Sequence, residues 1–200
     1  MKNNTQLYFN SLANNYENLS NKGIWNLVRL LEKHTLLNYV KKKKFNKILE
    51  LGCGSGYYTK YLTSFTKNKI TCVDFSDEML KNFCDSKVIK INQDIEKFKD
   101  NNIYDLIFCA GAIEFLKEPY SVFKNVSTML SEEGSFIILV PRKNILAFIY
   151  KLFHKHNKVK INLFEKKDIS NFCNINNLKI SKVNKIFPFS HSFIINKIKI

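Results

Sequence analysis

Short apolar stretches recur along the chain at intervals that suit buried strands, and amphipathic stretches separate them. The five stretches lie near residues 46–51, 69–74, 87–92, 104–109 and 135–140. Their apolar residues run almost without interruption, as in strands that are covered on both faces. Strands that alternate with helices at this spacing predict an α/β fold with a doubly wound, mostly parallel sheet and right-handed crossovers.

The end of the chain follows a different pattern, in which a proline-containing segment separates two alternating stretches. These stretches are Leu178–Phe187 and Ser192–Ile198, with residues 188–191 between them. Alternating apolar and polar residues on both sides of a short break predict an antiparallel hairpin. The hairpin would complete a seven-stranded sheet.

Helical periodicity is clearest near the start of the chain. Ile24, Leu27, Val28 and Leu31 recur at helical spacing, which predicts a helix over about residues 22–41. The preceding residues 1–21 predict a shorter helix that carries aromatic side chains. Later in the chain, Pro119 is well placed to begin a helix over residues 119–131, because proline suits the first helical position.

The turn after the first predicted strand carries glycine at every second position, at residues 52, 54 and 56. Glycine takes positive φ readily and has no Cβ, so a ligand can approach the main chain closely. A helix expected over about residues 57–65 would point its unpaired N–H groups and the positive end of its dipole into this turn. The stretch therefore predicts a nucleotide-type site at the carboxyl edge of the first strand.

Two details separate this turn from the dinucleotide fingerprint G-x-G-x-x-G. The fingerprint requires glycine where this chain has Tyr57, and Glu50 precedes the first glycine by two residues. The order Glu-Leu-Gly-Cys-Gly-Ser-Gly over residues 50–56 resembles the first motif of the class I S-adenosylmethionine-dependent methyltransferases of the small-molecule type. Residues 70–74, 75–80, 92–96, 104–110 and 130–136 resemble later segments of that family, in the same order. The resemblance covers about residues 45–141 and implies a Rossmann-like fold.

The resemblance also implies S-adenosylmethionine as the methyl donor and S-adenosylhomocysteine as the product. Asp74 would accept both ribose hydroxyls, Asp94 would accept the adenine amino group beside the Ile95 main chain, and Glu50 would orient the loop or reach the methionine amino group. For Tyr16 and Met79, packing against other side chains is the alternative to contact with the cofactor. The residues expected at the cofactor are Tyr16, Glu50, Gly52, Cys53, Gly54, Gly56, Asp74, Phe75, Met79, Asp94, Ile95, Cys109, Ala110 and Gly111.

We expect one domain over residues 1–200, in which four parts have different tasks. They are amino-terminal lid helices at 1–44, a cofactor-binding core at 45–141, a substrate cap at 142–164, and a last helix with the hairpin at 165–200. The cap is aromatic, amphipathic and basic, and it leaves the carboxyl edge of the fifth strand, where open α/β sheets bind ligands. A peripheral helix under a lysine-rich surface is the alternative. We expect the acceptor between this cap and the helix around Tyr16.

The sequence does not define a catalytic base. Glu114, His154, His156 and His191 are the candidates. The Asn-Pro-Pro-Tyr signature of family members that methylate adenine or glutamine amino groups is absent, since residues 109–114 read Cys-Ala-Gly-Ala-Ile-Glu. Neither HExxH nor a metal-like cysteine spacing occurs, so we expect no metal. Methyl transfer depends mainly on alignment of nucleophile and methyl group, which a scaffold alone can supply.

The formal net charge of +15 is typical of nucleic-acid-binding proteins. However, 30 of the 32 basic residues are lysine, and Arg29 and Arg142 are the only arginines. Surfaces that read bases or hold phosphates favour the bidentate arginine side chain. The composition therefore favours a small-molecule acceptor over nucleic acid. Three alternatives stay open: an RNA methyltransferase, a nicotinamide-dependent oxidoreductase, and a non-catalytic relative that kept the fold.

Five cysteines occur without a CxxC pair, which is typical of a reducing compartment. The first residues lack the apolar region of a signal peptide. The longest apolar run, residues 136–140, is far too short to cross a bilayer. We therefore expect a cytoplasmic protein without a membrane span.

Overall fold

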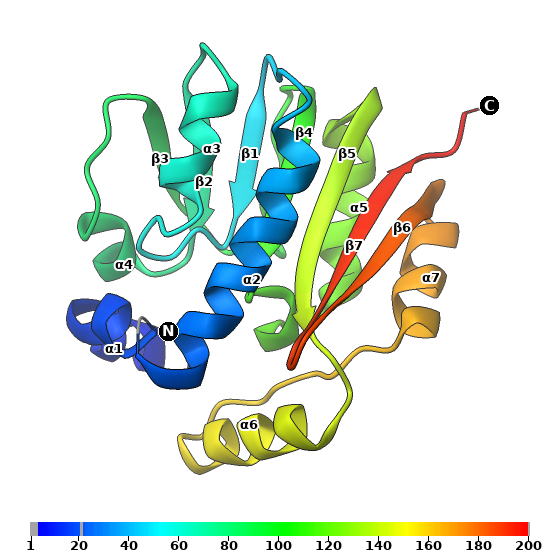
Figure 1. Cartoon of the computed structure of the whole chain (residues 1–200). Helices are drawn as coiled ribbons and strands as arrows, with labels where there is room; N and C mark the ends of the chain where they lie inside the picture. The colour runs from blue at the N-terminus through cyan, green and yellow to red at the C-terminus, as the bar shows by residue number, and fades with distance from the viewer. Residues whose placement is uncertain (1–3, 21, 200) are drawn as a thin grey trace.

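A computed structural model describes residues 4–20 and 22–199 of the chain. Its centre is a seven-stranded sheet in the order β3-β2-β1-β4-β5-β7-β6, shown in Figure 1. The strands are β1 (Ile48–Leu51), β2 (Ile70–Asp74), β3 (Val88–Asn92), β4 (Tyr104–Ala110), β5 (Leu130–Pro141), β6 (Leu178–Ile186) and β7 (Ser190–Lys197). The first five strands pair in parallel, and β7 is antiparallel to both β5 and β6. The predicted fold class is confirmed.

Helices cover both faces of this sheet (Figure 1). Two helices precede the first strand, α1 (Asn4–Ser20) and α2 (Gly23–Val40), and three lie between the parallel strands, α3 (Thr59–Leu62), α4 (Asp77–Lys81) and α5 (Pro119–Met129). The later helices are α6 (Ile145–His156) and α7 (Lys166–Asn174), and short 3-10 turns are η1 (Thr63–Phe65) and η2 (Ile113–Phe115). None of the helices in the described ranges is long and apolar enough to cross a membrane.

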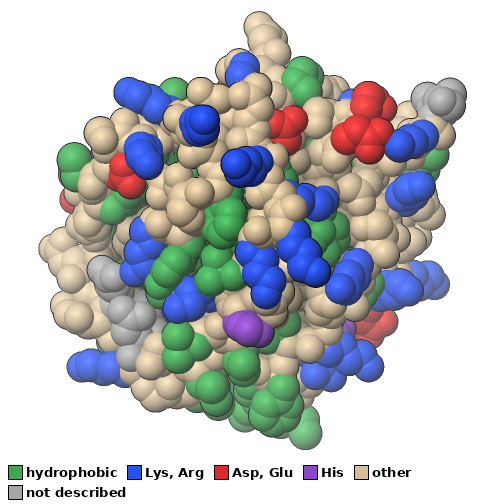
Figure 2. Space-filling model, turned by 45° about the horizontal axis from the view of Figure 1, so that its top comes forward, with side chains coloured by type: hydrophobic (Ala, Val, Ile, Leu, Met, Phe, Trp, Pro, Cys, Tyr) green, Lys and Arg blue, Asp and Glu red, His purple; other side chains and the backbone are tan. Residues whose placement is uncertain are grey.

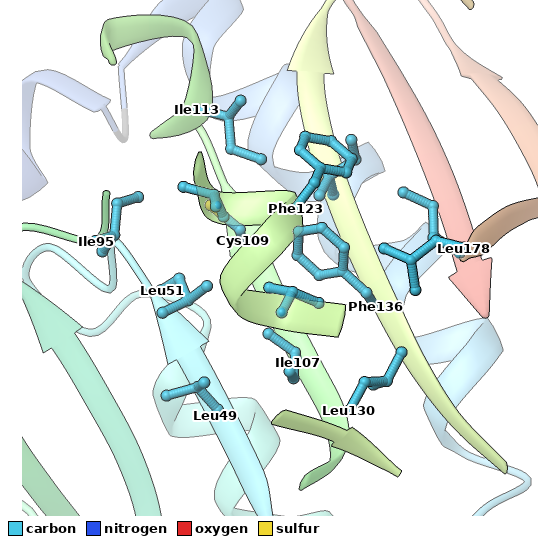
Figure 3. Close-up of a cluster of buried hydrophobic side chains, with 14 of the residues drawn as sticks. Leu49, Leu51, Ile95, Ile107, Cys109, Ile113, Phe123, Leu130, Phe136 and Leu178 are labelled. Atoms are coloured by element: carbon cyan, nitrogen blue, oxygen red, sulfur yellow. The ribbon is translucent and has the colours of Figure 1, made fainter. Parts of the chain in front are cut away.

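Successive residues of the central strands feed two separate cores. Leu49 and Ile107 face α5 and α7, in the cluster that Figure 3 shows. Ile48 and Leu106, one position away, face α2 and α3 in the second cluster. Because side chains alternate across a strand, a near-continuous apolar run is what a strand buried on both faces requires. The central strands are therefore packed on both faces, and their carboxyl ends form a platform for the loops above them.

Three boundaries differ from the sequence-based prediction. β5 begins at Leu130, about five residues earlier than expected, because Leu130 pairs with Tyr104 across a register shift. The preceding helix α5 therefore ends at Met129. In the hairpin, β7 begins at Ser190, so His191 is a strand residue that pairs with Val140 of β5. Of the first helix, residues 1–3 and 21 lie outside the described residues.

Candidate functional site

The glycine loop after β1 lies at the carboxyl edge of the sheet and takes its shape from main-chain contacts with β2. The N–H groups of Gly52 and Cys53 both donate to the carbonyl of Val73, at 2.7 and 3.2 Å. Gly52 and Gly54 have φ of 71° and 54°, which disfavours any residue with a side chain. A Cβ on Gly52 would lie 2.3 Å from the Ala112 Cβ, whereas a Cβ on Gly54 would have nothing within 4 Å. The main chain at Gly54 is therefore open to the space above it.

Asp74, the last residue of β2, holds the loop and the next helix together. Its carboxylate accepts hydrogen bonds from the Gly54 and Ser76 N–H groups, each at 2.8 Å. Burial raises the pKa of Asp74 to about 6, although the hydrogen bonds from Ser76 and Gly54 act in the opposite direction. The carboxylate is buried yet borders a cavity. Asp74 is thus an acceptor fixed in place by two main-chain donors.

Glu50 lies beneath the loop and does not border the cavity. Its Oε2 accepts a hydrogen bond of 2.6 Å from the Thr59 hydroxyl at the start of α3. Burial raises the pKa of Glu50 to about 8. Two roles were considered for Glu50, orientation of the loop and contact with the methionine amino group. The hydrogen bond with Thr59 is consistent with the first of these roles.

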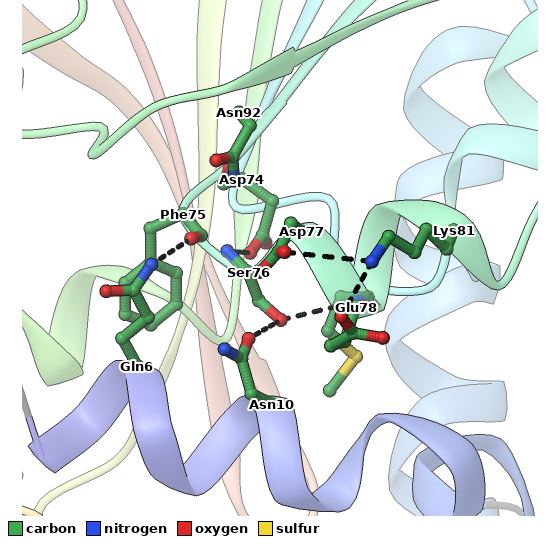
Figure 4. Close-up of polar contacts among 10 residues, drawn as sticks. Gln6, Asn10, Asp74, Phe75, Ser76, Asp77, Glu78, Lys81 and Asn92 are labelled. Carbon is green, nitrogen blue, oxygen red and sulfur yellow. Dashed lines mark hydrogen bonds and ion pairs between the residues drawn. The ribbon is translucent and has the colours of Figure 1, made fainter. Parts of the chain in front are cut away.

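Helix α1 lies against the residues that follow β2, as Figure 4 shows. The Gln6 side chain donates to the carbonyl of Phe75 at 2.6 Å, and the Ser76 hydroxyl donates to the Asn10 side chain at 2.6 Å. Ser76 also caps α4, because its oxygen accepts from the Met79 N–H at 3.1 Å. The same contacts therefore join the amino-terminal helix to the edge of the sheet that carries Asp74.

A first cavity of about 950 Å³, counting the space open to solvent, lies over the glycine loop. It brings together most of the residues that the sequence predicted at the cofactor: Tyr16, Gly52, Cys53, Gly54, Asp74, Phe75, Met79, Asp94, Ile95, Ala110 and Gly111. Glu50, Gly56 and Cys109 are not among its lining residues, and Cys109 is fully buried beneath the platform. A Cβ on Gly56 would meet the Phe83 ring at 2.7 Å, so this glycine allows packing of the loop.

A second, larger cavity of about 1820 Å³, again counting open space, adjoins the first. Its walls come from α1, α2, α6 and the β6–β7 turn, and aromatic side chains such as Trp25, Tyr150 and Phe189 line it. The two cavities share a boundary formed by Phe9, Tyr16, Arg29, Tyr58, Ala110, Gly111 and Phe115. A molecule in one cavity can therefore meet a molecule in the other above the end of β4.

Two of the four candidate catalytic residues, Glu114 and His154, line the second cavity. Burial raises the pKa of Glu114 to about 8, and its Oε2 has no hydrogen-bond partner among the described residues. Burial lowers the pKa of His154 to about 4, because the ring is enclosed by aromatic side chains such as Tyr150, 4.4 Å away between centroids. Both side chains are therefore uncharged near neutral pH in the protein without a bound ligand.

The other two candidates, His156 and His191, line neither cavity. His156 is exposed at the end of α6. His191 lies in β7, where burial first, and then the positive charges of Arg142 and Lys185, lower its pKa. Neither residue is positioned to touch a ligand in these cavities.

Arg29 and Glu32 of α2 are site residues that the sequence did not reveal. The Arg29 guanidinium lies 4.5 Å from the Tyr57 ring centroid, and its Nη1 has no hydrogen-bond partner among the described residues. Glu32 lines the second cavity, where its carboxylate accepts hydrogen bonds from Tyr58, at 2.7 Å, and from Ser190. Burial raises the pKa of Glu32. The sequence held one sign of a special role for Arg29, which is one of only two arginines in a chain rich in lysine. Across residues 4–20 and 22–199, no cluster of His, Cys, Asp and Glu could hold a metal ion.

Comparison with known sequences gives consistent matches. A family model described as a methyltransferase domain matches residues 49–138. Malonyl-[acyl-carrier protein] O-methyltransferase of Priestia megaterium is 30% identical over 139 residues, which cover 66% of this chain and 50% of that protein. Ubiquinone biosynthesis O-methyltransferase of Coxiella burnetii is 27% identical over 143 residues, covering 64% of this chain and 61% of that protein. The chain spans about half the length of the first of these curated relatives.

Solved structures share the fold over nearly the whole chain. DhpI in complex with SAH superposes with a TM-score of 0.74 at 14% identity, covering 97% of this chain and 95% of DhpI. Magnesium protoporphyrin IX methyltransferase (ChlM) from Synechocystis with bound SAH also has a TM-score of 0.74 at 14% identity, covering 96% and 98%. At 14% identity, this likeness shows a shared fold and nothing more.

Proposed function

We propose that this chain is a class I S-adenosylmethionine-dependent methyltransferase and that it transfers the methyl group of S-adenosylmethionine to an oxygen or nitrogen atom of a small organic molecule. The observation that carries the proposal is the pair of adjoining cavities. One lies over the glycine loop and Asp74, and the other meets it at Ala110 and Gly111. A transfer reaction requires two such compartments with a common boundary.

The residues around the first cavity fit S-adenosylmethionine. The open main chain at Gly54 lets a ligand lie directly on the loop, and the Asp74 carboxylate is suited to accept hydrogen bonds from ribose hydroxyls. Asp94 and Ile95 line the same cavity and would hold the adenine ring, with Met79 and Phe75 beside it. Arg29 would pair with the carboxylate of the methionine part, because its Nη1 is buried without a partner and guanidinium binds carboxylate strongly.

The second cavity would hold the acceptor. S-adenosylmethionine, when bound, would supply a methyl group on a sulfonium sulfur, so that the acceptor atom bonds to the methyl carbon as the carbon–sulfur bond breaks and S-adenosylhomocysteine leaves. The chain's own task is to align that nucleophile and exclude water, which the aromatic walls from α1 and α6 favour. Glu114 lines this cavity, and its deprotonated form would take the proton from the nucleophile, so turnover should rise with pH toward its pKa of about 8. His154, with its low pKa, would accept a hydrogen bond through Nδ1 and orient the acceptor.

The relatives support oxygen as the acceptor atom, since both named sequence relatives are O-methyltransferases. Nucleic acid is disfavoured as the acceptor, because arginine is nearly absent from a surface rich in lysine. We also propose a reducing compartment such as the cytoplasm, since the five cysteines are free and Cys84 is exposed.

Thermal unfolding with added ligands tests the proposal. S-adenosylmethionine and S-adenosylhomocysteine should each raise the melting temperature, whereas NAD and NADH should not, because ligands that bind only the folded state stabilise it. A shift with the nicotinamide nucleotides alone would point to an oxidoreductase. Intact S-adenosylmethionine binding with no turnover in any metabolite or RNA pool would identify a non-catalytic relative.

A further inference from the structure

Helix α6 is apolar on the side that faces solvent. Its inner side carries Ala147, Tyr150 and His154, which pack against the body of the protein or line the second cavity. Its outer side carries Ile145, Phe148 and Leu152, which are 80%, 57% and 49% exposed. These three residues line neither cavity, so acceptor binding gives no reason for their apolar character. A surface helix normally turns polar side chains outward, and contiguous exposed apolar surface marks an interaction site.

The apolar surface continues onto the rim of the second cavity. Leu19, Ile24, Ile149 and Phe153 all line that cavity, and each is more than half exposed. Trp25 lies at the same rim, 5.3 Å from both the Tyr150 and the Phe189 ring centroids. The mouth of the cavity and the outer side of α6 therefore form one apolar surface, which we call the α6 face.

The surroundings of the α6 face are basic. Within α6, every residue of which is described, no acidic side chain occurs, and the exposed lysines on and after the helix are Lys151, Lys155, Lys158 and Lys160. Figure 2 shows apolar side chains gathered along the lower edge of the molecule, where α6 lies in Figure 1, with Lys and Arg side chains above them and on both sides. An apolar helix face bordered by lysines is the pattern of helices that lie in the interface of an anionic membrane.

We propose that the α6 face docks on the surface of an anionic phospholipid bilayer. A second copy of the chain is disfavoured, because a formal charge of +15 on each copy would oppose self-association. A protein partner is disfavoured because protein interfaces carry about one hydrogen bond per 100–200 Å², whereas Ile145, Phe148 and Leu152 on the outer side of α6 have no side-chain donor or acceptor. Acyl chains require no hydrogen bonds, and anionic headgroups pair with the lysines.

Docking of this kind would turn the mouth of the acceptor cavity toward the lipid phase. One consequence rests on the proposed function: the acceptor would be an apolar or amphipathic molecule that enters the cavity from the bilayer. The docking itself does not depend on methyl transfer.

The test is binding of the full chain to vesicles. The protein should bind vesicles of phosphatidylcholine with phosphatidylglycerol, bind pure phosphatidylcholine vesicles far more weakly, and lose binding as salt rises. Trp25 is the only tryptophan, so a blue shift of its emission on vesicle addition reports contact at the rim. The double variant Phe148→Ser/Leu152→Ser should weaken partitioning roughly tenfold or more, since each large side chain loses its transfer into the apolar phase.

The matched control is Ile103→Ser/Ile175→Ser, which removes two exposed apolar side chains, 50% and 69% accessible, that lie outside α6 and line neither cavity. It should bind vesicles like the unaltered chain. Absence of binding to anionic vesicles, or equal binding by the Phe148→Ser/Leu152→Ser variant, would overturn the proposal. A dimer in sedimentation velocity that the same variant dissociates would overturn it too and would assign the face to a second copy.

Affinity for S-adenosylhomocysteine, measured on the same samples, separates the two proposals. Retained cofactor binding without vesicle binding removes the membrane proposal alone. Vesicle binding without any cofactor binding removes the proposed function and leaves docking in place.

Discussion

Replacement of Asp74 by alanine tests the cofactor site at the residue on which most of its geometry depends. The carboxylate accepts main-chain hydrogen bonds from Gly54 and Ser76, each at 2.8 Å, and it borders the first cavity. A hydrogen bond to a charged group contributes about 1.5–3 kcal/mol. Loss of one such bond to ribose should therefore raise the dissociation constant of S-adenosylhomocysteine roughly 10- to 150-fold.

Isothermal titration calorimetry at pH 7.5 measures this change directly. Glu78→Ala is the matched control, because it removes a carboxylate from the neighbouring helix that pairs with Lys81 at 2.7 Å on the surface. The control should leave the affinity within about twofold, since a surface ion pair contributes little. Thermal unfolding of the ligand-free variant would show how much the loop itself depends on Asp74.

The same titrations, repeated over a range of pH, test the raised pKa of Asp74. Burial raises this pKa to about 6, so the unaltered chain should lose affinity as the pH falls below about 6 and the carboxylate takes up a proton. The Asp74→Ala variant should show no such decline. An unchanged affinity at pH 7.5 in a folded Asp74→Ala variant would refute the assignment of this residue to the cofactor.

The remaining predictions concern the loop, the acceptor cavity and a buried acid. Gly54→Val should abolish cofactor binding in calorimetry, because φ is 54° and a branched side chain would enter the first cavity. Gly23→Val is the control, since Gly23 has a similar φ of 55° but lines neither cavity, and cofactor binding by the Gly54→Val variant at normal affinity would contradict the assignment of the loop. Tyr150→Ala should raise KM for the acceptor at least tenfold while cofactor affinity stays within about twofold, since Tyr150 lines the second cavity and not the first. Phe148→Ala, on the exposed side of α6, should affect neither value when the assay contains no vesicles. Burial raises the pKa of Glu114 from 4.5 to about 8, so the folded chain retains a proton that the unfolded chain releases, and the free energy of unfolding should fall as pH rises between these values. Glu114→Gln should flatten the dependence of melting temperature on pH over that window, and an identical dependence in both proteins would argue against the raised pKa.

The sheet and its glycine loop could be predicted because their signals are local. The strand residues around Leu49 and Ile107 are buried on both faces, so their apolar runs stand out in the sequence. The loop depends on glycines at every second position of one short stretch, and positive φ at Gly52 and Gly54 is consistent with that expectation. The place of Asp74 at the carboxyl edge of the sheet could be predicted because this residue directly follows the apolar run of a strand.

Other features depend on contacts between distant segments. The early start of β5 requires Leu130 to pair with Tyr104, which the apolar pattern around residues 135–140 does not reveal. The position of Arg29 at the boundary of the two cavities depends on how α2 crosses the sheet. Periodicity correctly predicted α2, yet Ile24 and Leu27 of the predicted apolar stripe are about half exposed, whereas Val28 is buried.

The segment over residues 142–164 combines both kinds of information. Its aromatic and basic composition predicted a helix near the acceptor, and α6 does line the second cavity through Tyr150 and His154. The sequence could not distinguish apolar residues that face the cavity from those that face solvent, because both kinds recur along the same short helix. Phe148 lies within the predicted cap, yet the structure exposes it on the outer side of α6, away from the second cavity.

Transfer of labelled methyl groups from S-adenosylmethionine measures the proposed activity itself. The purified chain is incubated with S-adenosylmethionine carrying a tritiated methyl group and with separate small-molecule, lipid and RNA fractions of a cell extract. The proposed function predicts label in a small organic molecule from the small-molecule or lipid fraction, with none in RNA, and loss of that label in the Gly54→Val variant. Label that enters RNA, or label in no fraction from a chain that binds the cofactor normally, would contradict it.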